Sequence, residues 1–334
     1  MSYAQISEGR NVMQPVNWGI LGAAKFARQH MGPAIHAANG SRLAAVASRS
    51  GDISAFQSFA PDCRAHDSYE ALLADPEIEA VYIPLPNHLH VDWARKAMAA
   101  GKHVLCEKPI AMSADKLDEL IAMRDETGLL CAEAFMILHH PQWQRAREIV
   151  QQGGIGRLRH VSAQFCYNNA SDPDNIRNKP DTGGGGVPDI GVYTLGSTRF
   201  VTGAEPREVA AQIDWENGVD VQADISAQFD GFTLQSMVSM RMANFQQVTY
   251  LGEAGHVKLT APFNPLVYGG AMLYHADAAG NVTAEKFPGV NHYVDQVEAF
   301  GRSLHDDTPY PVPLEFSKGT QIFIDRVFEA AARE

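Results

Sequence analysis

The sequence is poor in cysteine and has no long apolar run, and both absences narrow the classes of protein to which it can belong. Its four cysteines, Cys63, Cys106, Cys131 and Cys166, form no CxxC pair, and at least two lie in strand-like segments. Isolated thiols of this kind are typically buried and reduced, which predicts a cytoplasmic protein. No apolar stretch reaches about 18 residues, and residues 1–15 contain no apolar signal segment. No membrane span is therefore expected, and the first residues are interpreted as an arm.

Positive charge is also scarce. The 334 residues include 27 Lys and Arg against 39 Asp and Glu, a net charge of -12, and no basic block occurs. Nucleic acids and anionic membranes attract proteins through positive potential, so neither is expected to be a partner. The composition is globular, 45% hydrophobic and 20% charged, with enough length for about two domains. A small substrate of little or no charge remains possible.

A strand, a turn and a helix open the first half of the chain. Residues 17–21 suit a buried strand, and Gly22, Ala24, Lys25 and Phe26 lead into a helix-length segment. The G-x-A-x-x-A pattern departs twice from the dinucleotide-binding G-x-G-x-x-G. Even so, Gly22 allows the tight turn, Ala24 allows a pyrophosphate to approach closely, and the helix N-terminus suits its charge. These residues are predicted to bind a cofactor; the alternative is an ordinary tight turn.

A second strand, residues 43–47, follows at the spacing of a mononucleotide-binding unit and ends in Ser48 and Arg49. NAD-specific proteins usually have an acidic residue at this position, which binds the ribose 2′-hydroxyl. An arginine flanked by hydroxyl groups can instead bind the 2′-phosphate of NADP through charge-assisted hydrogen bonds. NADP is therefore the predicted cofactor, and nearby Asp52 leaves NAD possible.

Helical and strand patterns then alternate along the chain. They are predicted at residues 68–73 (helix), 80–83 (strand), 91–100 (helix), 104–106 (strand), 114–127 (helix) and 129–134 (strand). This alternation predicts an α/β fold with a doubly wound parallel sheet, and the nucleotide-binding domain is expected to span residues 16–137.

Two loops follow strands of this sheet at the edge where such sheets bind ligands. The first contains Pro84, Leu85, Asn87 and His90, which are predicted to contact the cofactor. Its H-x-H spacing could suit a metal, but no cysteine or carboxylate cluster completes a ligand set, so no metal site is predicted.

The second loop, residues 107–109, follows a short apolar strand. The amine of Lys108 is expected to face the ligand, with Glu107 beside it. The alternative is a solvated lysine on a surface loop.

Beyond a helical stretch at residues 142–152 the pattern changes to period-two strands. They are predicted at residues 158–167, 209–214, 223–229, 232–241, 247–252 and 256–260, with a two-residue turn at Asp230-Gly231. A mainly antiparallel open sheet is expected, in an α+β domain over residues 138–314. One face is expected to pack on helices. The other, with Phe232, Met237 and Met240, is expected to join two copies in a homodimer, unless it is a helix-covered core face.

A long polar loop, residues 168–186, ends in a glycine run that leads to Pro188. Proline suits the first turn of a helix, and Asp189 and Tyr193 are four residues apart, so a carboxylate and a phenol should project from one helix face. Loops of this length often act as lids. The alternative is a surface aspartate beside a core tyrosine.

Taken together, these segments resemble the Gfo/Idh/MocA family of oxidoreductases over nearly the whole chain. The motifs are GILGAA at residues 19–24, SR at 48–49, PLPNHLH at 84–90, EKP at 107–109, EAF at 133–135 and GGGGVPDIGVY at 183–193. Tyr193 stands where many members have histidine, as in the branch with dimeric dihydrodiol dehydrogenase, glucose-fructose oxidoreductase and xylose dehydrogenase. The resemblance implies redox chemistry on a sugar, polyol or diol. Of two final helices, predicted at residues 291–304 and 315–332, it implies that the last, within residues 315–334, packs back on the nucleotide-binding domain.

Two functions are compatible with these residues. In the first, an NAD(P)-dependent enzyme transfers a hydride between nicotinamide and a carbinol carbon. Lys108 binds the reacting oxygen and lowers the pKa of Tyr193, which acts as acid and base, while Asp189 positions the lysine or a substrate hydroxyl. In the second, a regulatory protein binds the dinucleotide or a sugar without turnover. A binding protein has no need of an acid–base pair, which favours the enzyme.

Overall fold

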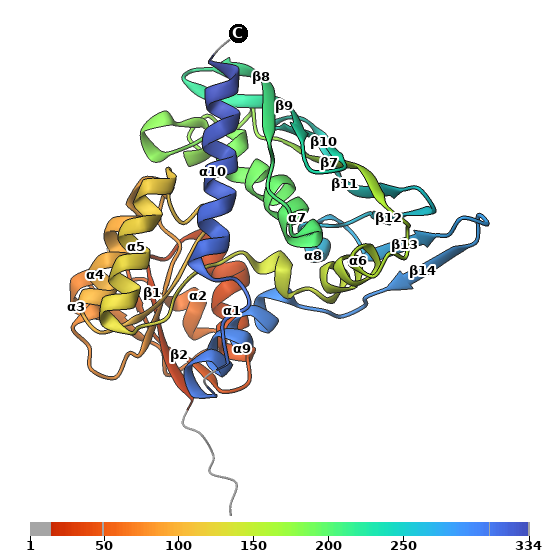
Figure 1. Cartoon of the computed structure of the whole chain (residues 1–334). Coiled ribbons are helices and arrows are strands. Elements are labelled where there is room, and N and C mark those ends of the chain that lie inside the picture. The colour runs from red at the N-terminus through yellow and green to blue at the C-terminus, as the bar shows by residue number, and fades with distance from the viewer. Residues whose placement is uncertain (1–14, 49, 307, 333–334) are drawn as a thin grey trace, which may run out of the picture.

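The structure, a computed structural model, describes residues 15–48, 50–306 and 308–332, whose strands form two sheets (Figure 1). Apart from residue 15, the expected N-terminal arm lies outside the described residues.

The first sheet is parallel and six-stranded, in the order β3-β2-β1-β4-β5-β6. Its strands are β1 (Val16–Leu21), β2 (Ser41–Ala47), β3 (Arg64–His66), β4 (Ala80–Ile83), β5 (His103–Cys106) and β6 (Cys131–Glu133). The predicted doubly wound fold is thereby confirmed. The strand order reverses between β1 and β4, and in open α/β sheets the crevice at such a reversal is where ligands bind.

Helices lie on both sides of this sheet. They are η1 (Ala27–Met31), α1 (Gly32–Ala37), α2 (Ser54–Gln57), α3 (Tyr69–Leu73), η2 (Asn87–Leu89), α4 (His90–Ala99) and α5 (Ala114–Thr127). Strand β4 and helix α5 occupy the predicted residues. All four side chains of β4 are buried, as an inner parallel strand requires. Helix α5 ends because Gly128 adopts the left-handed conformation, with φ 68°.

The second sheet has eight strands in the order β14-β13-β12-β11-β7-β10-β9-β8. They are β7 (Leu158–Asn168), β8 (Glu208–Glu216), β9 (Val219–Gln228), β10 (Thr233–Ser239), β11 (Arg241–Gly252), β12 (Gly255–Leu259), β13 (Met272–Ala276) and β14 (Val282–Lys286). Only β7 and β10 pair in parallel, so the expected mainly antiparallel sheet is confirmed. The sequence did not predict β3, β13 and β14, because these short strands are partly or largely exposed and show neither an apolar run nor a clear period-two alternation.

Helices α6 (Pro141–Gln151) and α7 (Val192–Thr202) lie on one side of the second sheet (Figure 1). The placement of Phe232 on the opposite face is wrong. Its ring stacks on Phe229, with centroids 4.5 Å apart, and Phe229 contacts Phe323 of helix α10 (Leu314–Ala331). Phe232 therefore belongs to the core between sheet and helices, because the turn at Asp230-Gly231 brings it opposite Phe229. The placement of Met240 on the opposite face is wrong as well, because Met240 is completely buried and its Cγ would lie 3.6 Å from a Cβ on Gly186, directly before the helical turn Val187–Gly191.

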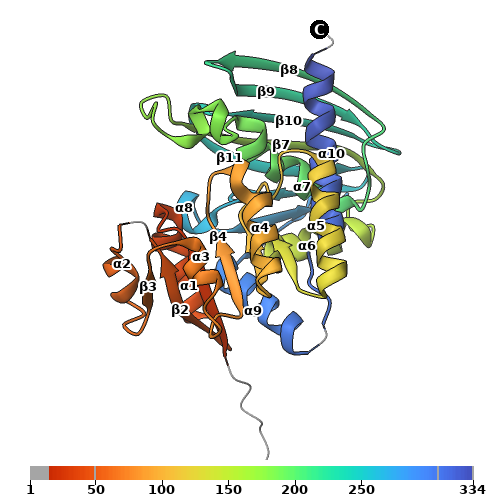
Figure 2. The same cartoon turned by 90° about the vertical axis from the view of Figure 1, so that its left-hand side faces the viewer.

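Two C-terminal helices return to the first sheet. Helix α9 (His292–His305) packs against α1, and α10 runs along both α5 and β8 (Figure 2). Lys318 pairs with Asp118 and Arg124 with Glu315, so α10 is joined to α5 by two ion pairs. Helix α10 thus contacts both sheets.

Three features of the described residues bear on the expectations from composition. None of their helices combines the length and apolar character needed to cross a bilayer. All four cysteines are buried and free. Within residues 15–48, 50–306 and 308–332, no group of three or more His, Cys, Asp and Glu side chains could hold a metal ion.

Candidate active site

A cleft of about 800 Å³ lies between the carboxyl end of the first sheet and the helix-covered face of the second. Most of the predicted site residues line it: Ala24, Lys25, Phe26, Pro84, Leu85, Asn87, Glu107, Lys108, Asp189 and Tyr193. Residues far apart in the chain therefore share one site, as the expected crevice requires.

The turn after β1 fits a dinucleotide. Gly22 has φ 109°, a conformation that L-residues rarely adopt, and a Cβ there would lie 3.2 Å from the hydroxyl of Tyr69. The chain is helical from Lys25 through Ala37, so the helix begins directly after the turn. The turn thus leaves room for a pyrophosphate to approach the backbone near that helix start.

The end of β2 is described only in part. Ser48 is buried and its Oγ lies 3.0 Å from the Oγ of Ser50. Arg49 lies outside the described residues, so its predicted contact with a 2′-phosphate stays a prediction.

The prediction that His90 contacts the cofactor is wrong. Its side chain is completely buried, and its ring nitrogens lie 2.8 Å from the carbonyl oxygen of Pro109 and 2.7 Å from that of Leu85. His90 instead joins the two loops that follow β4 and β5. The sequence could not distinguish a cofactor contact from a link between the loops, because a residue in either role lies at the same edge of the sheet.

Asn87 also makes an unexpected contact. Its Nδ2 donates a 2.8 Å hydrogen bond to the carbonyl oxygen of Gly183, in the long polar loop of the second half. The loop after β4 is thus tied to the loop that leads to Asp189, across the cleft.

The loop that carries Lys108 is held by two carboxyl groups, the partly buried one of Glu107 and the buried one of Glu133. Glu107 accepts a 2.6 Å hydrogen bond from the hydroxyl of Tyr82, and Glu133 accepts one of 3.0 Å from the backbone N–H of Ile110. Burial raises the pKa of both carboxyl groups. These contacts fix the backbone on both sides of Lys108.

Asp189 is the centre of the polar network. Lys108 donates to its carbonyl oxygen (2.6 Å) and to its Oδ1 (2.9 Å). On the other side, Arg177 Nε and the Tyr167 hydroxyl each lie 2.8 Å from Oδ2. Burial opposes ionisation of Asp189, but Arg177 and Lys108 outweigh it and hold the pKa of the carboxyl group well below its usual range. Asp189 is therefore a carboxylate at neutral pH.

Sequence reasoning missed Arg177 and Tyr167. Arg177 lies on η4 (Ile176–Asn178), inside the long polar loop that was interpreted as a lid, and Tyr167 lies near the end of β7. The loop length signalled a functional segment, but nothing in it singled out Arg177.

Asp189 and Tyr193 reach Lys108 from one helix. Asp189 lies in η6 (Val187–Gly191), a π-helical turn with Pro188 as its second residue. This turn continues into α7, which carries Tyr193. The amine of Lys108 lies over the ring of Tyr193, 4.8 Å from its centroid. The predicted shared face therefore exists, with the lysine opposite both side chains.

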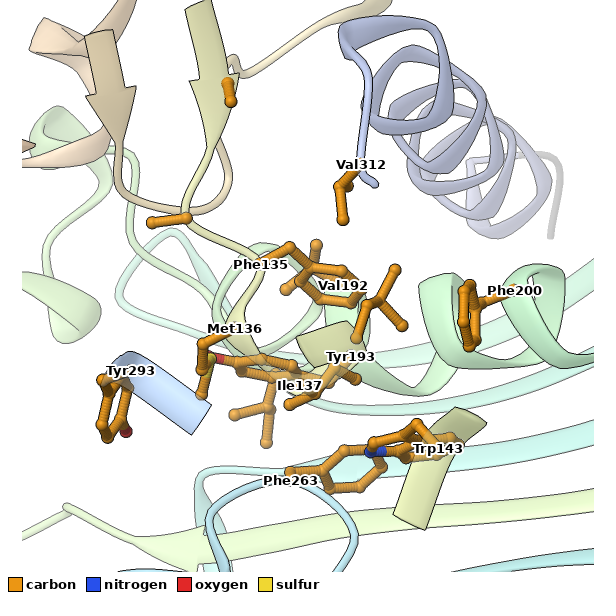
Figure 3. Close-up of a cluster of buried hydrophobic side chains, with 14 of the residues drawn as sticks. Phe135, Met136, Ile137, Trp143, Val192, Tyr193, Phe200, Phe263, Tyr293 and Val312 are labelled. Carbon is orange, nitrogen blue, oxygen red and sulfur yellow. The ribbon is translucent and has the colours of Figure 1, made fainter. Parts of the chain in front are cut away.

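The expected lowering of the Tyr193 pKa is wrong for this arrangement. The tyrosine is 6% exposed and lies among apolar side chains, including Phe135, Met136 and Phe263 (Figure 3). Burial and then the charge of Glu107 raise the pKa of Tyr193 well above its ordinary value. Lys108 does not reverse this shift, because its amine faces the ring and donates to Asp189. The phenol keeps its proton at neutral pH.

Comparison with known proteins agrees with this geometry. Residues 16–135 match the Gfo/Idh/MocA oxidoreductase family with an NAD-binding Rossmann fold, and residues 143–258 match the Gfo/Idh/MocA C-terminal domain. The chain belongs to the Gfo/Idh/MocA family. It is thus an oxidoreductase by family, and the resemblance seen in the sequence is confirmed.

Individual members of the Gfo/Idh/MocA family are similar over nearly their whole length. An uncharacterized oxidoreductase of Rhizobium meliloti is 38% identical, over 96% of this chain and 98% of the relative. A D-xylose 1-dehydrogenase (NADP(+)) of Haloferax volcanii is 35% identical, over 94% and 97%. Among solved structures, a 3-ketoreductase from Actinomadura kijaniata, in complex with NADP and TDP-benzene, has a TM-score of 0.87 and 29% identity, over 95% and 98%.

In this Gfo/Idh/MocA protein, a buried carboxyl group that the sequence did not reveal supports the start of the Asp189 helix. Asp220 of β9 is 2% exposed and accepts a hydrogen bond from the backbone N–H of Val187. Gly185 packs directly on it, with φ 123°, and a Cβ at that position would overlap Asp220 Oδ1. Gly185 and Asp220 together set where η6 begins.

Gly185→Ala is therefore expected to destabilise the protein by about 3 kcal/mol, from the left-handed strain and the collision combined. It should also lower kcat, because Asp189 follows four residues later. Gly128→Ala is the control for a positive φ without a collision, since Gly128 has φ 68° and nothing lies within 4 Å of its would-be Cβ. We expect a loss of about 1 kcal/mol there, with normal kcat. Urea unfolding and steady-state kinetics measure both variants, and equal effects would contradict the role of Gly185.

Proposed function

We propose that this protein is an NADP-dependent oxidoreductase that acts on a carbinol or keto group of a sugar or a related polyol or diol. The observation that carries the proposal is the position of Lys108. Its amine sits in the cleft beside the cofactor loops, fixed by Asp189 and stacked over Tyr193. The activities of two relatives, a D-xylose dehydrogenase and a sugar 3-reductase, support the substrate class.

The bound dinucleotide supplies the hydride chemistry. The residues fit it: the turn at Gly22 would face the pyrophosphate, and Pro84, Leu85 and Glu107 line the cleft towards Lys108. Asn87 holds the loop of the second half against this region.

Lys108 is suited to bind the reacting oxygen. An ammonium group has three N–H donors, and the contacts of the described residues use two of them, both on Asp189. The third is left for a ligand oxygen in the cleft, where it can stabilise developing negative charge during carbonyl reduction.

Tyr193 is suited to donate a proton. Its raised pKa keeps the phenol protonated, so in the reductive direction it can transfer its proton to the oxygen that Lys108 binds. In the oxidative direction the same group has to lose its proton first. Near neutral pH the phenol is therefore in the protonation state that carbonyl reduction requires.

The experiment that tests this function measures absorbance of the reduced nicotinamide. Protein is mixed with NADP and a panel of aldoses, polyols and diols, and with NADPH and a panel of keto sugars. Turnover of at least one compound is expected. If NADPH binds and no compound in either panel reacts, the regulatory alternative replaces the enzyme.

Cofactor preference has its own expected result. Arg49→Ala should weaken NADP binding far more than NAD binding, because only NADP presents a phosphate to the guanidinium group. Fluorescence titration with both reduced cofactors measures the two losses. Equal losses would show that Arg49 does not bind the 2′-phosphate.

A cytoplasmic homodimer is also part of the proposal. Four buried free thiols support a reducing compartment. The sheet face away from α6 and α7 supports the dimer, because it carries Met237 and the half-exposed Phe245 and Leu251. Light scattering at several concentrations tests the assembly: twice the chain mass supports the dimer, and a single chain mass contradicts it.

A further inference from the structure

A buried amide with an unused acceptor lies in the wall of the cleft. Gln246 is 4% exposed and lies on the same side of β11 as the buried Val248 and Tyr250. Its backbone N–H donates to the hydroxyl of Tyr268 (3.0 Å), and its Nε2 donates to Asn264 Oδ1. Its Oε1 is enclosed and accepts no hydrogen bond from any described residue.

Asn169 lines the same cleft and has a donor, not an acceptor, without a hydrogen-bond partner. Its Oδ1 accepts a 2.8 Å hydrogen bond from Arg241, which fixes the orientation of the amide. Its Nδ2 is enclosed and has no acceptor among the described residues. A buried polar atom without a partner is unfavourable, so a ligand that supplies the missing partners binds more tightly.

The charges of the cleft indicate that this ligand is uncharged. Of the described cations that line it, Lys108 and Arg177 are both paired with Asp189. Lys25 lies on the cofactor side, at the helix start after β1. A diphosphate or phosphate group in the outer part of the cleft would therefore lack an unpaired cation, and buried charge without a partner is strongly unfavourable.

We propose that Gln246 and Asn169 form a subsite that recognises hydroxyl groups of an uncharged sugar, with Gln246 Oε1 accepting from one ligand hydroxyl and Asn169 Nδ2 donating to a ligand oxygen. The inference rests on the proposed function for the identity of the ligand as a sugar. Sites that hydrogen-bond a ligand hydroxyl discriminate strongly against the analogue that lacks it, since their own polar groups are then left unpaired.

The test measures, by calorimetry, how tightly each variant binds each sugar. The full-length protein is used, saturated with NADPH. The ligands are D-xylose, D-glucose and D-galactose, followed by the monodeoxy derivatives of whichever binds most tightly. In the wild type, at least one derivative should bind about 10- to 100-fold more weakly than its parent. In Gln246→Leu the affinity for the parent sugar should fall by a similar factor. The affinities of that parent and that derivative should then differ by less than about threefold.

Two further variants separate recognition from damage. Gln246→Asn keeps both an amide acceptor and an amide donor without adding a charge, and should keep part of the discrimination between parent and derivative. Gln247→Leu, on the next residue and the opposite side of β11, should bind every sugar as the wild type does. Thermal unfolding and NADPH affinity, measured for each variant, show that the fold and the cofactor site are intact.

The outcomes are distinct. The subsite is wrong if Gln246→Leu still discriminates between the parent sugar and every derivative as the wild type does. It is also wrong if none of the three sugars binds. If dTDP-D-glucose or D-glucose 6-phosphate binds more tightly than D-glucose, the ligand is charged and the proposal is overturned. Because binding is measured without turnover, the subsite can be confirmed or lost independently of whether the absorbance panel shows a reaction.

Discussion

Replacing Lys108 by methionine is expected to lower kcat by at least about a hundredfold while leaving NADPH affinity within a few-fold of normal. Asp189 holds the amine in place for the reacting oxygen, and loss of such a positioned donor typically lowers kcat by this factor. Methionine keeps most of the side-chain length and its packing against Tyr193, so the change removes charge and N–H donors rather than bulk.

Steady-state kinetics with the most active sugar measures the Lys108 effect, and a fluorescence titration measures cofactor affinity. Lys116→Met is the control, because Lys116 is half-exposed and its ion pair is with Glu119 on the surface of α5. Near-normal turnover of Lys108→Met would reduce Lys108 to an ordinary loop lysine. Loss of NADPH binding would make its role structural.

Tyr193→Phe is expected to lower kcat for carbonyl reduction by at least about a hundredfold, because the phenol is the proton donor in this account. The pH dependence separates this role from packing. The pKa of Tyr193 is raised, so the proton stays on the phenol across the neutral range. Reductive kcat should therefore not fall through loss of this proton between about pH 6 and 9. In the oxidative direction kcat should keep rising with pH over that interval, without a plateau.

Tyr274→Phe serves as the control for Tyr193, since Tyr274 lies on β13 of the second sheet, its hydroxyl is 3.6 Å from Met272 Sδ, and it does not line the cleft. It should leave rate and pH profile unchanged. If Tyr193→Phe retains the wild-type rate and the rising oxidative limb, another group transfers the proton. A plateau of the wild-type oxidative rate near pH 7 would mean instead that ligand binding lowers the pKa of Tyr193.

Much of the fold could be predicted because its signals are local. Strand β4 is a run of apolar residues between helical patterns, and the bounds of α5 follow from its pattern and from Gly128. Strands β13 and β14 escaped prediction because they are short and partly exposed, and they exist through pairing with β12 and with each other. Pairing between distant residues leaves little trace in a single sequence.

The site residues likewise divide into those with a local sequence pattern, which could be predicted, and those without one. Lys108 and Asp189 were expected to lie together, because each follows a recognisable local pattern, and they do. Arg177 and Gln246 were missed because their positions depend on contacts made only in the folded chain, with Asp189 and Asn264. The predicted direction of the Tyr193 pKa shift was wrong for a physical reason: proximity to an ammonium group was foreseen from sequence, whereas burial of the side chain to 6% exposure was not.

The most direct test of the central claim follows the hydrogen atom itself. The most active sugar of the panel, deuterated at every carbon, is incubated with the wild-type protein and NADP, and the reduced nicotinamide is isolated and examined by NMR and mass spectrometry. The account predicts one deuterium per reduced cofactor, at nicotinamide C4, and no such product with Lys108→Met over the same time. Reduced cofactor without deuterium at C4, formed from a fully deuterated sugar that the protein oxidises, would contradict it.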